Sequence, residues 1–147
     1  MSVHIRQADS SDVPAILALY AQIDFNNDAV LSEVEAQKIF AEFARYPSYR
    51  IFVAIDADQV VGSYALLVMH NMAHGGMPSA VVEDVVVSSA LQGRGIGRQM
   101  MSHAKEHAKA AGCYKLALSS NRARHAAHAF YESLGFDQHG LSFVIEP

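Results

Sequence analysis

A strand, a glycine-rich turn and the start of a helix follow one another in residues 80–97, which read AVVEDVVVSSALQGRGIG. The first half is an apolar run interrupted only by Glu83 and Asp84, which is typical of a central strand covered on both faces. The second half carries glycines at positions 93, 95 and 97. Glycines let a ligand approach the backbone closely, and the free N–H groups at a helix start attract an anion. The segment therefore predicts a phosphate-binding turn.

Two well-known phosphate-binding loops do not fit this turn. A P-loop ends in Gly-Lys-Ser/Thr, whereas Gly97 is followed by Arg98 and Gln99. The dinucleotide fingerprint Gly-x-Gly-x-x-Gly, counted from Gly93, would need a third glycine where the chain has Arg98. Arg98 therefore excludes both motifs, because it stands where the first needs lysine and the second needs glycine.

The remaining patterns predict one α/β domain, with helices on both faces of a mixed sheet. A first strand holds Val3 and Ile5, and a first helix follows an N-cap at 9–11 and ends at 26–28. A second helix begins with a capping box of Ser32 and Glu35 and stops before Pro47. The further elements expected are strands over 49–55, 60–68, 80–87 and 115–119, helices over 96–111 and 127–134, and one or two closing strands within 136–145.

Composition excludes several classes of protein. Of the 147 residues, 51% are hydrophobic and 18% are charged, which favours a packed core over disorder. The net charge of −4 disfavours nucleic-acid binding. The single cysteine, Cys113, excludes an internal disulfide and suits a reducing compartment. With no long apolar run and no signal sequence, we expect one cytoplasmic domain over 1–147, with no nucleic-acid or membrane partner.

One pattern does fit the glycine turn. The spacing Val87-x4-Gln92-x2-Gly95-x-Gly97 resembles the acetyl-CoA motif of the GCN5-related N-acetyltransferase (GNAT) superfamily, although Ser89 stands where proline is common. A second block resembles the family's other acetyl-CoA segment and consists of Asn121, Ala127, Phe130, Tyr131, Gly135 and Phe136. The order of elements matches the family fold, so the resemblance covers nearly the whole chain.

The resemblance implies acetyl-CoA as cosubstrate, with no metal. In the family, the pantetheine lies along the strand at 85–87 and the pyrophosphate rests on the amides of the glycine turn. The residues that the resemblance assigns to acetyl-CoA are Val85, Val86, Val87, Gln92, Gly93, Arg94, Gly95, Ile96, Gly97, Arg98, Asn121 and Tyr131.

The resemblance also implies catalytic roles. Tyr131 matches the tyrosine that protonates the departing thiolate, and a phenol with a pKa of roughly 10 suits that role. Glu83 is the candidate general base, directly or through a water, with Asp84 or a histidine as the alternative. Strand alternation would point Glu83 and Asp84 to opposite faces unless a bulge disturbs the register.

Several other polar residues are candidates for binding. His70 and His74 flank the loop before the central strand and could contact the substrate or deprotonate it, and Asp84 is a further candidate substrate contact. His103 and His107 have a spacing that can hold a metal, but with no third ligand we interpret them as a solvated helix face. Three further side chains are candidate anion contacts, namely Arg50, Arg122 and Arg124.

Two subfamilies carry matching stretches. Residues 119–121 and 124–131 resemble aminoalkylphosphonate N-acetyltransferases, while 83–87 and 112–115 resemble glucosamine-phosphate N-acetyltransferases, with Ser119 in place of the latter's aspartate. The implied acceptor is a small primary amine, phosphorylated or phosphonylated, or an amino sugar. The alternatives are a protein acceptor, which an open acidic groove would favour, and a CoA-binding module without catalysis. The family often dimerises through terminal strands, and residues 143–145 could supply one.

Overall fold

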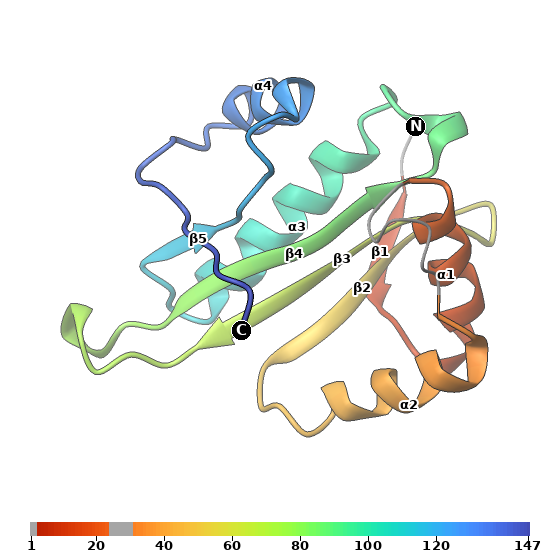
Figure 1. Cartoon of the computed structure of the whole chain (residues 1–147), viewed down its shortest axis with the longest axis horizontal. Coiled ribbons are helices and arrows are strands. Elements are labelled where there is room, and N and C mark those ends of the chain that lie inside the picture. The colour runs from red at the N-terminus through yellow and green to blue at the C-terminus, as the bar shows by residue number, and fades with distance from the viewer. Residues whose placement is uncertain (1–2, 24–30) are drawn as a thin grey trace. The chain divides into compact units, whose positions relative to one another are not determined.

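The computed structural model describes residues 3–23 and 31–147, and the chain divides into two compact units, Met1–Ala117 and Leu118–Pro147. The first unit contains a five-stranded sheet in the order β1-β2-β3-β4-β5 (Figure 1). Neighbouring strands run antiparallel, except that β4 and β5 are parallel, which confirms the predicted mixed sheet. The bounds are β1 His4–Gln7, β2 Tyr49–Asp56, β3 Gln59–Met69, β4 Ser79–Val87 and β5 Lys115–Ala117.

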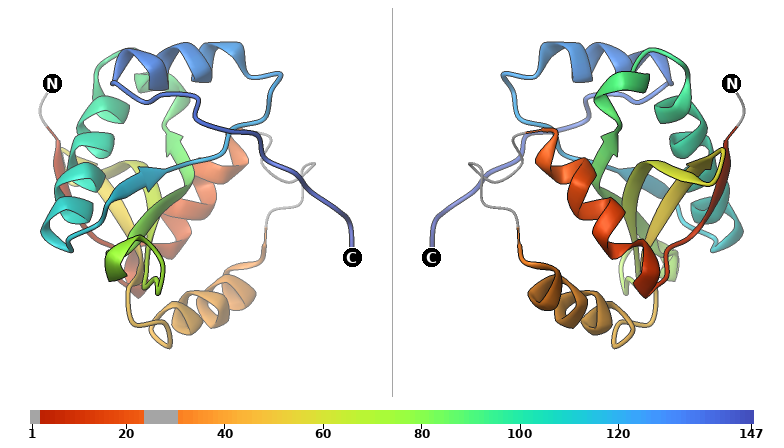
Figure 2. Two further views of the ribbon diagram at one scale, coloured as in Figure 1. Left: turned by 90° about the vertical axis from the view of Figure 1, so that its left-hand side faces the viewer. Right: turned by 90° about the vertical axis from the view of Figure 1, so that its right-hand side faces the viewer.

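Helices cover both faces of this sheet. Helix α1 (Val13–Ala21) and helix α2 (Glu33–Phe43) lie on one face, and α3 (Ile96–Ala110) lies on the other (Figure 2). On the first face, Ile16 of α1 packs in a core cluster with Val53 of β2. On the second face, buried Met100 of α3 lies so close to β3 that a Cβ on Gly62 would be 3.0 Å from its sulfur. The glycine is what permits this approach.

The helix starts follow the capping residues in the sequence. Asp9 accepts a hydrogen bond from the N–H of Ser11 at 2.9 Å, and Asp12 accepts one from the N–H of Asp9 at 2.8 Å, which begins the short turn Ser10–Asp12 before α1. Ser32 accepts from the N–H of Glu35 at 3.3 Å at the start of α2. The predicted end of the first helix at 26–28 lies outside the described residues.

The second unit contains helix α4 (His125–Ser133) and no strand among its described residues. The prediction of closing strands within 136–145 is therefore wrong. A strand exists only through a ladder to a neighbour, and the apolar tail of this unit has no pairing partner in the described chain. Its large side chains stay exposed instead, at 84% for Leu141 and 98% for Val144. The preceding strand β5 also ends at Ala117 rather than at the predicted residue 119.

No helix in the described part of the chain is long and apolar enough to cross a membrane.

Candidate active site

The parallel pairing of β4 with β5 is short. It consists of Ser79 with Lys115, Ala80 with Leu116 and Val81 with Ala117, whereas β4 continues to Val87. Within the described residues, positions 82–87 therefore have no strand partner on the β5 side. Backbone N–H and C=O groups on such an edge can bind an extended ligand as a further strand would. The predicted contacts Val85, Val86 and Val87 lie in this stretch.

A bulge interrupts β4 beside the free edge. Glu83 pairs with Ala65 and Val86 pairs with Ser63, so Asp84 and Val85 together oppose the single residue between those two on β3. Asp84 has a φ of 52°, in the left-handed region that aspartate tolerates better than most residues. A bulge re-aims the side chains on its strand, so strict alternation no longer applies here.

Both carboxylates of the bulge face the α1–α2 side of the sheet. Glu83 lies opposite Ala65, which lies opposite Ile51, and Ile51 packs against the core cluster under α1. Residues directly opposite each other across strands share a face, so Glu83 is on this side. The charge of Asp84 reaches Tyr20 of α1 on this side. Burial first, and then that charge, raise the pKa of the Tyr20 phenol. Simple alternation, which would point Glu83 and Asp84 to opposite faces, therefore does not hold here, because the bulge that was its stated exception is present.

The glycine turn adopts the backbone that its residues permit. Gly93 and Gly95 have φ values of 80° and 83°, and an added Cβ would meet nothing within 4 Å at either position. Conformation rather than crowding thus requires glycine there. Gly95 is the N-cap of α3 and provides no side chain to cap it, so the first N–H groups of α3 have no partner within the helix. This arrangement fits a diphosphate.

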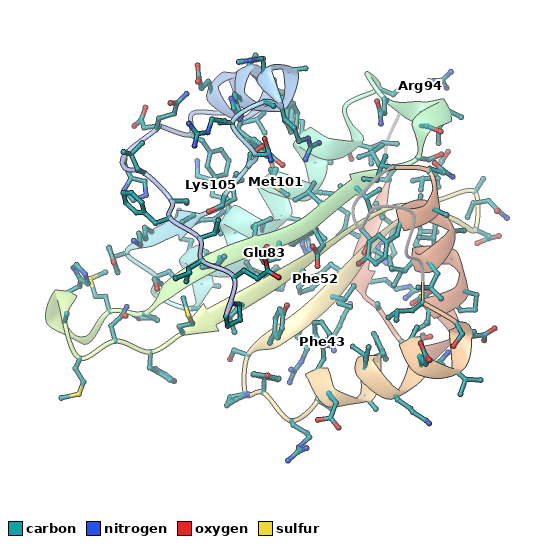
Figure 3. All side chains as sticks on the ribbon, viewed as in Figure 1. Phe43, Phe52, Glu83, Arg94, Met101 and Lys105 are labelled. Carbon is teal, nitrogen blue, oxygen red and sulfur yellow. The ribbon has the colours of Figure 1, made fainter. Side chains whose placement is uncertain are left out.

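The side chains of the turn divide into one anchor and several exposed polar groups. Ile96 is 1% exposed and fixes the start of α3 in the core. Gln92, Arg94 and Arg98 are exposed, and Figure 3 shows Arg94 at the end of β4 remote from the β3–β4 connection. Two guanidinium groups beside uncapped N–H groups can make charge-assisted contacts with phosphate oxygens.

In the second unit, Asn121 and Tyr131 are held by local contacts. The side-chain oxygen of Asn121 accepts from the N–H of Ala123 at 2.9 Å, and its carbonyl accepts from the N–H of Arg124 at 3.0 Å. The ring of Tyr131 lies 5.8 Å from that of Phe136. Burial raises the pKa of Tyr131, while Arg124 lowers it. The net upward direction keeps the phenol protonated at neutral pH, as a proton donor requires.

The hydroxyl of Ser120, beside Asn121, is buried and has no hydrogen-bond partner among the described residues. Buried polar groups in proteins are nearly always paired, so an unpaired hydroxyl next to a predicted acetyl-CoA residue also fits a bound ligand.

The structure does not bring His70 and His74 to the carboxylates. Both follow β3 in the connection to β4, where the ring of His74 stacks on Tyr114 at 4.2 Å. The last paired row of this hairpin is four residues from the row that holds Glu83, or about 13 Å at the usual rise of a strand. These histidines therefore lie at the far end of β4.

Arg50 has a structural role rather than the predicted anion contact. One of its terminal nitrogens donates to the carbonyls of Phe43, Tyr46 and Tyr49 at 3.3, 3.0 and 2.8 Å. The other donates to the carbonyl of Pro47 at 3.4 Å. These bonds satisfy the carbonyl groups around the end of α2.

Sequence reasoning missed the roles of two aromatic residues and one histidine. Burial and then the charge of Asp84 raise the pKa of both Tyr20 and Tyr49, and only the recurrence of aromatic residues at 43, 46 and 49 hinted at an aromatic cluster. The predicted solvated position of His103 is wrong, because it is half-buried against Phe52 with ring centroids 4.9 Å apart. Within the described residues no histidine, cysteine and carboxylate groups are gathered for a metal.

Comparison with known proteins places these features in a family. The profile of the acetyltransferase (GNAT) family matches residues 14–136. A probable glucosamine 6-phosphate N-acetyltransferase 2 from Oryza sativa is 33% identical over 98% of this chain and 87% of its own. An aminoalkylphosphonate N-acetyltransferase from Salmonella typhimurium is 27% identical over 95% and 88%. The structure of a putative acetyltransferase from Agrobacterium tumefaciens superposes with a TM-score of 0.91 at 38% identity, covering 98% and 99%.

Proposed function

The chain belongs to the GNAT acetyltransferase family, and from this premise we propose that it transfers the acetyl group of acetyl-CoA to the primary amine of a small molecule. The observation that carries the proposal is the free edge of β4 at 82–87, which leads into the uncapped start of α3. An extended chain ending in a diphosphate matches both parts of this site. Family membership makes the chain an acetyltransferase rather than a non-catalytic binding module.

Acetyl-CoA supplies an activated acetyl thioester when bound. The free backbone groups of 85–87 would hold the pantetheine, and the N–H groups from Gly93 to Arg98 would hold the diphosphate, with Arg94 and Arg98 adding charge. Gln92, Ile96 and Asn121 complete the proposed contacts. No metal is part of the proposal.

The proposed chemistry needs one base and one acid. The amine nitrogen forms a bond to the acetyl carbonyl carbon while the carbon–sulfur bond breaks. Glu83, exposed on the bulge, accepts the amine proton directly or through a water, and Tyr131 gives its proton to the leaving thiolate. Asp84 is the alternative base, and the partial burial of its carboxyl group raises its pKa.

The acceptor classes to test first come from the relatives. Glucosamine phosphate and aminoalkylphosphonates are small primary amines that carry an anionic group. A protein amine is a second candidate, favoured by the exposure of Glu83 and Asp84 on the surface.

Two measurements test the proposal. Calorimetry with coenzyme A tests binding to the whole chain, and thiol release from acetyl-CoA with a panel of amines and lysine peptides tests transfer. We expect saturable binding and thiol release that depends on the amine. No saturation at millimolar coenzyme A would overturn the proposal.

We propose further that the chain acts in the cytoplasm, without a nucleic-acid or membrane partner, and as a homodimer. The exposed side chains of Phe143, Val144 and Ile145 support the dimer, because an apolar extended segment can pair with a second copy. Sedimentation should give a dimer mass, and Phe143→Ser combined with Ile145→Ser should give the monomer mass. A monomer before substitution would contradict the dimer.

A further inference from the structure

The acceptor side of the site has an unusual charge balance. Glu83 and Asp84, which we call the acidic pair, both lie on the α1–α2 face at the bulge. Both are exposed, and within the described residues of the first unit neither forms an ion pair. Two neighbouring carboxylates without a cation produce a negative potential that favours a cationic ligand and disfavours an anionic one.

An aromatic surface lies on the same face as the acidic pair. Tyr49 stands two residues before Ile51 on β2, so it shares the face of Glu83. Its ring lies 4.3 Å from that of Phe43 and 5.5 Å from that of Tyr46, and Tyr46 is 52% exposed. We call Phe43, Tyr46 and Tyr49 the aromatic cluster. Figure 3 shows Phe43 at the end of α2 and Glu83 on β4.

The strand register places the acidic pair near the aromatic cluster, because Tyr49 pairs with Leu67 and Leu67 pairs with Val81, two residues before Glu83 on β4. In keeping with this, the charges of Asp84 and Glu83 both raise the pKa of Tyr49, after the larger effect of burial. Asp84 acts in the same direction on Tyr20 of α1. Carboxylates beside aromatic ring faces form the combination that binds alkylammonium groups, through charge and through cation–π attraction.

The arginine that adjoins the aromatic cluster is occupied. Arg50 adjoins the aromatic cluster, but its guanidinium already donates to the backbone carbonyls of all three cluster residues and of Pro47. Arg45 is also engaged, since it pairs with Glu42 at 3.0 Å. Among the described residues of the first unit, the arginine that adjoins the aromatic cluster is therefore held by backbone carbonyls rather than left for a phosphate.

We propose that the acceptor is a small diamine or polyamine, whose second ammonium group binds between Asp84 and the aromatic cluster while its other amine reaches Glu83. This assignment rests on the proposed acetyl transfer and names its substrate class. It separates the chain from relatives whose names specify phosphate- or phosphonate-bearing amines. The anionic groups of such acceptors would meet the acidic pair without a compensating cation.

The test compares acceptors whose second group is cationic, neutral or anionic. With the whole chain and saturating acetyl-CoA, thiol release is measured for 1,4-diaminobutane, for n-pentylamine, which has the same length, and for 2-aminoethylphosphonate and glucosamine 6-phosphate. We expect kcat/KM for the diamine to exceed that for each of the others at least tenfold. Calorimetry of the diamine and n-pentylamine on the chain loaded with coenzyme A gives the same comparison independently of turnover.

Variants locate the preference on the structure. Asp84→Asn should reduce the ratio of kcat/KM for diamine over monoamine toward one, mainly through KM for the diamine. Tyr49→Leu should reduce the ratio more than Tyr49→Phe, which keeps the ring. Asp58→Asn is the matched control, since Asp58 is an exposed carboxylate in the β2–β3 turn with a φ of 62°, and its ratio should equal that of the parent chain.

The outcomes separate this inference from the proposed function. Coenzyme A binding together with equal values for diamine and monoamine, or a preference for the phosphonate, the sugar phosphate or a lysine peptide, would overturn the diamine assignment alone. An unchanged ratio in Asp84→Asn would also overturn it. Failure of coenzyme A to bind would overturn the proposed function itself.

Discussion

The phenol oxygen of Tyr64 lies 2.6 Å from Nδ1 of His103, so a hydrogen bond joins the middle of β3 to α3. Tyr64 is 1% exposed, and burial raises its pKa, so the phenol remains the donor and the imidazole the acceptor. The ring of Phe52 packs against both, with centroids 5.3 Å from Tyr64 and 4.9 Å from His103. The contact makes the packing of α3 depend on a neutral histidine.

Acid should therefore weaken the fold through His103. Its pKa is lowered by burial first, then by His107 and His4, so the unfolded chain takes up a proton at higher pH than the folded chain does. The contribution is fully present above the unfolded value of about 6.5 and is lost as pH falls from there through the lower folded pKa. Urea unfolding at pH 7.5 and pH 5.5 should show this loss, and His103→Gln should show less of it.

The control is His70→Gln, which removes an exposed histidine from the end of the β3–β4 hairpin. It should keep the pH dependence of the parent chain. If His103→Gln keeps it as well, the interpretation of the Tyr64–His103 contact is wrong.

Replacing Asp12 by Asn should destabilise the first unit by about 1.5–3 kcal/mol, because the charge-assisted hydrogen bonds from Arg6 to a buried carboxylate are lost. Asp12 is buried and accepts from Arg6 at 2.7 and 3.0 Å. The exposed pair of Arg45 with Glu42 is the comparison, and Glu42→Gln should leave the urea midpoint unchanged. Equal effects of the two substitutions would show that burial does not distinguish the pairs.

Gly95→Ala should weaken coenzyme A binding and also lower the unfolding free energy by about 1–2 kcal/mol, the cost of a left-handed non-glycine residue. Gly76→Ala provides a matched control. Gly76 has a φ of 77° and equally open surroundings, but lies in the β3–β4 connection. It should lose similar stability in thermal unfolding and keep the parent dissociation constant for coenzyme A. A loss of affinity in both variants would contradict a local role for the turn.

Tyr131→Phe should lower kcat by about 10²–10⁴, the usual contribution of a general acid, with coenzyme A affinity within about twofold of the parent. The limb of the pH–rate profile at high pH, where the phenol of raised pKa ionises, should disappear. Tyr114→Phe removes a phenol that stacks on His74 and should leave kcat unchanged. A Tyr131→Phe enzyme with parental kcat would remove the acid assignment.

Glu83→Gln should lower kcat/KM about 10²-fold and remove the limb of the pH–rate profile on the acid side. Glu106→Gln, on an exposed position of α3, is the control and should match the parent. If instead Asp84→Asn removes the acid limb and Glu83→Gln does not, the base is Asp84. Rates of thiol release measured over pH 5–9 for both variants distinguish Glu83 from Asp84 as the base.

The parts of the fold that depend on local chemistry were predictable from the sequence. The N-cap at Asp9, the capping residue Ser32 and the glycine turn each need only a few neighbouring residues, and each was confirmed. The bulge at Asp84 was not predictable in position, because it is defined by a residue count on a different strand. The prediction of a strand around Phe143 was wrong for a related reason. Its apolar pattern fits a strand, but the described chain offers no partner strand for it.

The ligand contacts proposed for residues 82–98 are made largely by peptide groups, whereas those proposed for the acceptor are made by side chains. Truncating side chains along β4 one at a time would thus report packing and pass over much of what holds the coenzyme. Apart from the glycines that need a positive φ, side chains beside the coenzyme can therefore be exchanged with little penalty as long as the backbone path persists, and a change of acceptor needs only a few exchanges around Asp84 and Tyr49.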